Sequence, residues 1–368
     1  FRRVLFRSPD AGRLQEEEAE YANRGGFSRH RPARPLYTEK DAKRALRQLR
    51  PVAFGKWIDT DGVRLCFHPA GHLLGAATVT VEHAHRRVVF SGDLGRLNDP
   101  VLMPPESIER ADYLILESTY GNRRHEKEDT RERLGAIIRA TLERDGVLLI
   151  PAFAVGRTQS LLHDIGVLKQ QGAIPDSVPV FLNSPMATEA TEVYIRYGRQ
   201  HGAENRLSPQ QWSALGAVAH CVGSPEESRR LNERAGPMII IAGSGMATGG
   251  RVVHHLKAFA PDPRNTILFA GFQAGGTRGA ALVAGASEIK IHGEYVPVRA
   301  RVEMIENLSA HADAGELLQW LGGFAQAPRK VFINHGEPMA ADALRRAIEE
   351  KFGWNCQVPD YLESVVLG

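Results

Sequence analysis

The stretch ADYLILESTYGNRRHEKEDTRERLGAIIRATLERDGVLLIP (residues 111–151) decides the fold class. Its apolar run Tyr113–Glu117 predicts a buried strand, Arg131–Arg144 predicts a helix, and Gly146–Pro151 predicts a second strand. The same alternation continues at Thr158–Lys169, Val178–Leu182, Met238–Ala242, Val252–Ala260 and Thr266–Ala270. Alternating strands and helices predict an α/β sandwich with a buried sheet.

The flanking segments extend this pattern. Thr38, with Asp41 three positions later, predicts the start of a helix that runs to about Leu49. Residues 52–90 then show the period-two alternation of strands. Further elements are expected at Glu288–His292 and Val296–Ile305 (a hairpin-like pair), Ala314–Phe324, Lys330–Asn334 and Ala340–Phe352. No linker rich in Gly, Ser or Pro divides the chain, so a second domain is expected to be inserted into the first.

Composition sets broad limits on function. The net charge of +3 and the pI of 8.8 allow a polyanionic partner without requiring one. No apolar run approaches the roughly 20 residues that cross a bilayer, so we expect no membrane role. The three cysteines are far apart in sequence (Cys66, Cys221 and Cys356), which is typical of reduced thiols in a cytoplasmic protein.

The N-terminus is unusual. Phe1–Ser8 (FRRVLFRS) lacks an initiating Met, and it has neither the apolar core nor the cleavage site of a signal peptide. It resembles translated adapter sequence. We therefore expect residues 1–8 to be artefactual and the chain to be a fragment.

Several short stretches place metal-ligand or acid/base residues just after predicted strands, where α/β folds collect functional groups. His72 and Asp93 each stand among glycines, in Ala70–Ala76 and Phe90–Gly95. Glu117 ends an apolar strand, where a carboxylate is costly to bury unless it is paired. His311 and His335 follow apolar runs near the C-terminus. Taken alone, each of these histidines and Asp93 is more typical of a turn or a structural residue.

Together, in this order, the five residues resemble the motifs of the β-CASP group of metallo-β-lactamase-fold nucleases. Further matching stretches are Ile150–Gln159, Asn183–Met186 and Ala242–Met246. The resemblance implies a four-layer αββα metallo-β-lactamase domain, incomplete at the N-terminus, with an inserted α/β β-CASP domain. The implied boundaries are 1–121 and 299–368 for the metallo-β-lactamase domain and 122–298 for the β-CASP domain.

The resemblance also implies roles. His72, Asp93 and His335 would bind two Zn²⁺, with Asp93 bridging them, and a hydroxide between the cations would attack the RNA phosphodiester. His311 would be the general acid, and Glu117 would hold its ring and favour its protonated form. Asp93, Glu117 and His311 are thus the expected catalytic residues.

Small and basic residues are candidates for binding the substrate. The loop Gly243–Gly245 is suited to presenting backbone N–H groups to phosphates, although tight packing explains its glycines equally well. The candidate substrate-binding residues are Arg157, Ser184, Ser244, Gly245, Arg251 and Ser309.

One departure from the family is serious. The motif H-x-H-x-D-H, which supplies the remaining metal ligands, is absent from this sequence. We expect it to lie upstream of Leu14 in a longer parent, so that this chain binds zinc poorly and cleaves little. His83-Ala84-His85 is not a substitute, because the expected hairpin turn passes through it. His68 and the pair His254-His255 are also expected to be structural.

The leading interpretation is a zinc-dependent ribonuclease, since DNA-repair members of the group usually carry Val at the position of His335. The alternatives are a DNA nuclease of the same fold and a non-catalytic nucleic-acid-binding scaffold. Whether cleavage is internal or from the 5′ end stays open, and a homodimer is possible.

Overall fold

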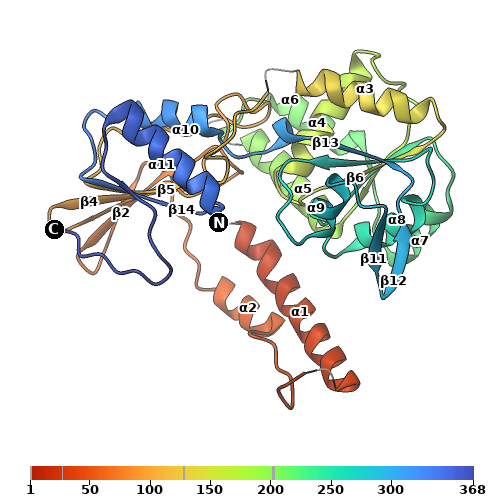
Figure 1. Cartoon of the computed structure of the whole chain (residues 1–368), viewed down its shortest axis with the longest axis horizontal. Coiled ribbons are helices and arrows are strands. Elements are labelled where there is room, and N and C mark those ends of the chain that lie inside the picture. Colours follow the sequence, from red (N-terminus) through yellow and green to blue (C-terminus); the bar gives the residue numbers. More distant parts are fainter. Residues whose placement is uncertain (1, 27, 127–128, 201–203) are drawn as a thin grey trace. The chain divides into compact units, whose positions relative to one another are not determined.

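The computed structural model describes residues 2–26, 28–126, 129–200 and 204–368, and it divides into two compact units, Phe1–Lys56 and Trp57–Gly368. The first unit contains α1 (Arg2–Gly25) and α2 (Glu39–Leu46) (Figure 1). Thr38 begins α2 with both hydrogen bonds of a capping box, so the predicted helix is confirmed, although it ends at Leu46. Residues 1–8 stay predicted as artefactual; residue 1 lies outside the described residues, and residues 2–8 are helical in α1.

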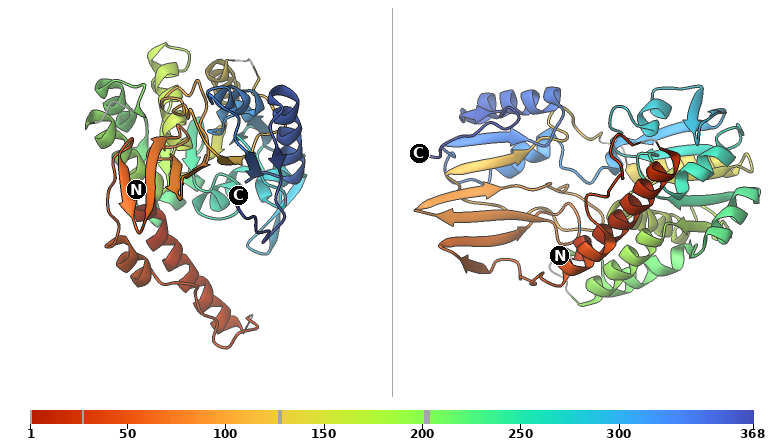
Figure 2. Two further views of the ribbon diagram at one scale, coloured as in Figure 1. Left: turned by 90° about the vertical axis from the view of Figure 1, so that its left-hand side faces the viewer. Right: turned by 90° about the horizontal axis from the view of Figure 1, so that it is seen from below.

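The second unit contains a seven-stranded sheet with the strand order β1-β2-β3-β4-β5-β14-β15. Its strands are β1 (Trp57–Thr60), β2 (Val63–Pro69), β3 (Ala77–His83), β4 (Arg86–Phe90), β5 (Tyr113–Glu117), β14 (Lys330–Asn334) and β15 (Cys356–Gln357). The right-hand view of Figure 2 shows these strands side by side. The first four are joined antiparallel, whereas β4, β5, β14 and β15 run parallel. The sheet therefore joins segments that are more than 200 residues apart.

The two faces of this sheet differ in burial. Val89, Leu114 and Val331 point to one face and are fully buried there. That face packs against α10 (Ala314–Leu321) and α11 (Pro338–Phe352) (Figure 1). The alternate residues form an apolar row on the other face, in which Ile115 is half-buried and Phe90 is exposed. Strand alternation thus gives both faces apolar side chains, as expected of a sheet inside a layered sandwich.

A six-stranded parallel sheet has the strand order β13-β10-β6-β9-β7-β8. Its strands are β6 (Val147–Pro151), β7 (Val180–Asn183), β8 (His220–Cys221), β9 (Met238–Ala242), β10 (Thr266–Ala270) and β13 (Arg301–Ile305). The helices around it are α3 (Thr130–Leu142), α4 (Arg157–Gln170), α5 (Pro185–Gln200), α6 (Pro209–Val218), α7 (Pro225–Glu233), α8 (Arg251–Phe259) and α9 (Arg278–Val283).

Both faces of this second sheet are buried. Leu148 and Ile150 of β6 point into a core shared with α3 and α4. Val147 and Leu149 point the other way, into a core that includes Leu256 of α8. A sheet covered on both faces explains why its strands are continuous apolar runs rather than alternating ones.

Two features differ from the sequence-based expectation. The segment Val296–Ile305 is not one strand, because β12 (Glu294–Pro297) pairs with β11 (Glu288–Ile291) while β13 joins the parallel sheet. Pro297 supplies no backbone donor and ends the hairpin strand. The helices α5, α6, α7 and α9 had not been predicted. The boundaries at 121/122 and 298/299 stay predictions, although β13 lies in the second sheet despite following position 298.

Among the residues that the structure describes, no helix combines the length and the apolar character needed to span a bilayer.

Candidate functional site

Parallel strands place three of the predicted site residues at one edge of the seven-stranded sheet. Glu117, the last residue of β5, lies opposite Asn334 of β14, so His335 follows directly beside it. Asp93 follows β4, which is parallel to β5 on its other side. The carboxyl ends of parallel strands meet at one edge, and side chains placed there converge.

Two glycines allow the remaining loops to approach that edge. A Cβ at Gly95 would overlap the backbone of Gly71, and a Cβ at Gly71 would lie 2.7 Å from the carbonyl oxygen of Met103. The backbones of Gly71 and Leu94 form an isolated bridge, as do those of Gly95 and His311. These contacts bring the loops that carry His72, Asp93 and His311 together.

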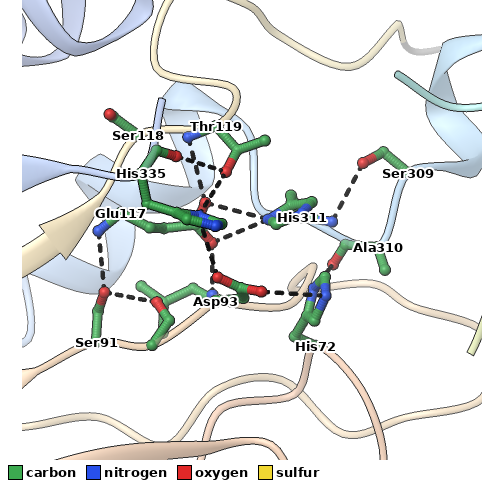
Figure 3. A network of polar contacts seen from close by, with 12 residues as sticks. His72, Ser91, Asp93, Glu117, Ser118, Thr119, Ser309, Ala310, His311 and His335 are labelled. Atoms are coloured by element: carbon green, nitrogen blue, oxygen red, sulfur yellow. Dashed lines mark hydrogen bonds and ion pairs between the residues drawn. The ribbon is translucent and has the colours of Figure 1, made fainter. Parts of the chain in front are cut away.

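The resulting cluster has donors suited to a divalent metal (Figure 3). Nε2 of His72 lies 3.8 Å from Oδ2 of Asp93, and Nδ1 of His335 lies 3.2 Å from Oδ1 of Asp93. Ligand atoms about 2.0–2.2 Å from a tetrahedral zinc are separated by roughly 3.3–3.6 Å. Imidazole nitrogens and a carboxylate oxygen are also common zinc ligands. The three predicted metal ligands therefore have the chemistry that zinc prefers, and they form two pairs that share Asp93 and lie near this separation.

The backbone fixes the orientation of His72. Its Nδ1–H donates to the carbonyl oxygen of Ala310 at 3.2 Å, which turns Nε2 toward Asp93. Metal-binding histidines typically donate their second ring nitrogen to a carbonyl or a carboxylate in this way. The tautomer that binds a metal through Nε2 is therefore already selected.

Glu117 is the buried partner of His311. Only 2% of Glu117 is exposed, and its carboxylate accepts hydrogen bonds from the backbone N–H of Leu94 at 2.6 Å and from Nδ1 of His311. Burial lowers the pKa of His311, but the hydrogen bond and the charge of Glu117, aided by Asp93, raise it above the ordinary value. A histidine that holds its proton near neutral pH is suited to general acid catalysis.

The same geometry permits a second role for His311. Donor atoms of His72, Asp93 and His311 all lie within 4.8 Å of one another, and the rings of His72 and His311 are 4.3 Å apart. A carboxylate on Nδ1 is equally typical of a histidine that binds metal through Nε2. The acid and the ligand roles of His311 therefore need a functional test.

A second group of donors lies behind His311 and was not singled out from the sequence. His125, Asp313 and Glu316 have ligand atoms within 4.8 Å of one another, but these side chains already form hydrogen bonds to backbone groups. Nε2 of His125 donates to the carbonyl of His311, and Asp313 and Glu316 form the capping box that begins α10. This group fixes the loop that presents His311. The spacing Asp313-x-x-Glu316 was the sequence signal for it.

Two of the predicted substrate-binding residues lie near the cluster. Ser309 Oγ accepts a hydrogen bond from the backbone N–H of His311 at 3.3 Å. Arg157 is 8% exposed and lines a cavity that Ser309 also lines. Among the described residues it has no hydrogen-bond partner.

The other four serve the structure in the described state. Ser184 Oγ accepts from the N–H of Ala187 at the start of α5, and Ser244 Oγ accepts from the N–H of Thr248. A Cβ at Gly245 would lie 2.7 Å from the ring of Phe153, so the packing explanation accounts for this glycine.

The guanidinium of Arg251 already forms hydrogen bonds within the protein. It donates to Oδ1 of Asn183 at 2.7 Å and to the carbonyl oxygen of Val222 at 2.9 Å. These bonds tie the start of α8 to the ends of β7 and β8. The geometry therefore gives Arg251 a structural role, and its predicted phosphate contact would have to replace these bonds.

The histidines expected to be structural lie outside the cluster. Ala84 and His85 form the turn between β3 and β4 with positive φ angles, as predicted. His68 pairs with Glu106 at 2.8 Å. His255 is fully buried between Asn183 and Asn232.

Comparisons with known proteins identify the family of the chain. Residues 158–282 match the family model of the Beta-Casp domain, and residues 295–359 match that of the Zn-dependent metallo-hydrolase RNA specificity domain. The chain is 40% identical to Ribonuclease TTHA0252 of Thermus thermophilus over 322 residues, which are 85% of this chain and 72% of that protein.

Archaeal relatives are similar over a comparable stretch. Transcription termination factor FttA of Pyrococcus abyssi is 33% identical over 90% of this chain and 53% of its own length. An RNase J-like protein of Methanocaldococcus jannaschii is 31% identical over 82% of this chain and 70% of its own length. The chain thus spans about half the length of the termination factor.

The family models, the relatives and the mixed α/β fold agree with one another. The chain belongs to the β-CASP group of metallo-β-lactamase-fold RNA nucleases.

Proposed function

We propose that the protein is a zinc-dependent phosphodiesterase that hydrolyses RNA at the cluster of His72, Asp93, Glu117, His311 and His335. The observation that carries this proposal is the convergence of these five side chains, whose sequence positions span more than 260 residues (Figure 3). Packing alone does not require five titratable or metal-binding side chains to meet at one place, because burying such groups is costly.

The chain's own residues provide four functions. His72, Asp93 and His335 offer the nitrogen and oxygen atoms that would hold zinc. When bound, zinc supplies Lewis acidity and lowers the pKa of water. His311 holds the proton that the leaving oxygen of the RNA needs, and Glu117 keeps it on the ring. Ser309 and Arg157 lie where they could contact the substrate near His311.

The zinc affinity of this chain is expected to be low. Zinc sites normally use three or four protein ligands for each ion, and three predicted ligands shared between two ions fall short of that number. The sequence holds no H-x-H-x-D-H motif to complete them. We infer that residues 1–368 alone bind zinc weakly and cleave RNA slowly.

The test combines metal analysis with cleavage. After dialysis we expect less than one zinc per chain, and with excess zinc we expect slow cleavage of an RNA strand but not of a matched DNA strand. Tightly held stoichiometric zinc would contradict the weak-binding inference. The absence of zinc binding even at millimolar concentration would contradict the metal site itself.

The alternatives predict different outcomes. A DNA nuclease would cleave the matched DNA strand at least as fast as the RNA. A non-catalytic scaffold would bind RNA, and His311→Ala would change neither binding nor cleavage. The presence of all five site residues in one cluster favours the enzyme. Pairing of two copies is a separate expectation, which sedimentation velocity would test.

A further inference from the structure

A cavity of about 300 Å³ lies beside the proposed catalytic cluster, and Arg157 and Ser309, the two proposed substrate contacts, both line it. Its lining comes from the loop after β4, the start of α3, the start of α4 and the residues before His311. Ser309 lines the cavity and binds the backbone of His311, so the cavity adjoins the proposed general acid. Its volume lies at the lower end of the range for small-ligand sites.

Arg157 is the residue of this cavity whose unpaired donors indicate a bound ligand. Its side chain is more than nine-tenths buried, yet none of its donors has a hydrogen-bond partner among the described residues. Burial lowers the pKa of Arg157 to about 10, so the group is still charged at neutral pH. Buried polar groups are normally hydrogen-bonded, and a buried unpaired charge is destabilising. An unpartnered guanidinium facing a cavity therefore indicates a site that a ligand fills.

Asp99 supplies the complementary group. It is 8% exposed, and its Oδ1 accepts hydrogen bonds from the N–H groups of Val101 and Leu102, both at 2.8 Å. Its Oδ2 has no partner in the described part of the chain. Among the charges that act on Arg157, Asp99 has the largest effect on its pKa, but the two do not form an ion pair within 4.0 Å. A ligand between them would meet donors on one side and an acceptor on the other.

The charge of the lining argues against a phosphate as that ligand. Three arginines line the cavity, but so do four acidic residues. Two of these arginines already have partners, because Arg131 holds Asp164 through Nε and Nη2, both at 2.9 Å, and Arg96 donates to the carbonyl oxygen of Asn307. A doubly charged anion would meet a lining without surplus positive charge. A neutral, flat group with both acceptors and donors fits this lining better.

We propose that this cavity is a nucleobase pocket that selects guanine in the RNA substrate beside the scissile phosphate. Guanine presents O6 and N7 as a pair of acceptors for an arginine, and its N1–H and N2–H₂ donors lie on another edge, where Asp99 can accept them. Adenine offers only one acceptor to Arg157, and uracil has no amino donor for Asp99. The assignment rests on the proposed function for its RNA substrate, but not on any metal.

Binding of mononucleotides without zinc tests the pocket separately from catalysis. We expect GMP to bind the chain at least about tenfold more tightly than AMP, CMP and UMP, with inorganic phosphate weaker still, in titration calorimetry or ligand-observed NMR. Equal binding of all four nucleotides, or of phosphate alone, would overturn the base pocket. A preference for CMP would overturn the guanine assignment. RNA cleavage without GMP binding would overturn the pocket and leave the proposed function intact. GMP binding without RNA cleavage would support the pocket and contradict the proposed function.

Variants make the test specific. Arg157→Met should abolish the GMP preference while raising the thermal midpoint, because it removes an unpaired buried charge. Asp99→Asn keeps the oxygen that accepts from Val101 and Leu102 but presents N–H groups to the ligand. It should therefore weaken the affinity for GMP by at least about tenfold. Arg110→Met, at an exposed position, is the control and should change nothing. If Arg157→Met unfolds the protein or leaves GMP binding unchanged, Arg157 is not the ligand of a base.

Discussion

Nδ1 of His311 lies 3.1 Å from Oε2 and 3.2 Å from Oε1 of Glu117, although 194 residues separate the two in sequence. The carboxylate also accepts the backbone N–H of Leu94 from the loop that carries Asp93. The pair therefore links two of the segments that build the cluster. The same pairing suits either a general acid or a metal ligand, and the first prediction separates these roles.

Zinc affinity should distinguish His72 from His311. Replacing His72 by Ala removes a proposed ligand and should weaken zinc binding by roughly tenfold or more, as measured by competition with a chelating dye. Replacing His311 by Ala should change the affinity by less than about threefold and should slow RNA cleavage by about 10²–10⁴-fold. His85→Ala, in the β3–β4 turn, is the control with no expected effect. A loss of zinc in His311→Ala as large as in His72→Ala would make His311 a ligand.

Gly95 should be indispensable for folding of the site. A Cβ at this position overlaps the backbone of Gly71, and backbone cannot move aside as a flexible side chain can. Gly95→Ala should lower the free energy of unfolding by about 3 kcal/mol or prevent folding. Gly275→Ala, where a Cβ would meet nothing within 4 Å, is the matched control and should change stability by less than about 1 kcal/mol. Urea unfolding followed by circular dichroism measures both, and equal stabilities would contradict the close approach of the two loops.

His255 should make the stability of the protein dependent on pH. Burial, then the charges of His254 and Arg251, lower the pKa of His255 to about 4. Its hydrogen bonds explain why the neutral form is needed. Arg251 donates to Oδ1 of Asn183, so the amide N–H of Asn183 must face Nε2 of His255, which has to accept.

The sign follows from the two protonation equilibria of His255. In the unfolded chain this residue gains a proton below pH of about 6.5, whereas in the folded protein it does so only near pH 4. Its stabilising contribution is therefore complete above pH 6.5 and is lost as the pH falls toward 4. Between pH 7 and pH 5 the loss should be about 2 kcal/mol. His255→Gln, which offers an acceptor and donors without titrating, should show a pH dependence weaker by that amount in urea unfolding. An unchanged pH dependence would contradict the buried neutral histidine.

The sequence predicted most of the fold that positions the site. Strands such as Tyr113–Glu117 and Lys330–Asn334 were predicted to the residue, because buried parallel strands are short continuous apolar runs. Helices α5 to α7 and α9 were missed. They mix small and polar residues, and tertiary packing around Trp212 rather than periodicity holds α6 in place.

Some of the site residues could be predicted from the sequence and others could not. His72, Asp93 and Glu117 were found because glycine-rich strand ends are local signals. The group of His125, Asp313 and Glu316 was missed, since the spacing of Asp313 and Glu316 signals only the cap of α10 and His125 joins them through contacts across the fold. The structural role of Arg251 and the unpartnered state of Arg157 were also beyond the sequence, because both depend on which acceptors lie within reach. Local chemistry can be read from sequence order, but hydrogen-bond satisfaction cannot.

The most direct test of the metal site is anomalous diffraction at the zinc edge from crystals of the chain soaked in excess zinc. We expect a peak within bonding distance of Nε2 of His72 and the carboxylate of Asp93, beside His335. A peak only at His125, Asp313 and Glu316, or no peak at all, would contradict it.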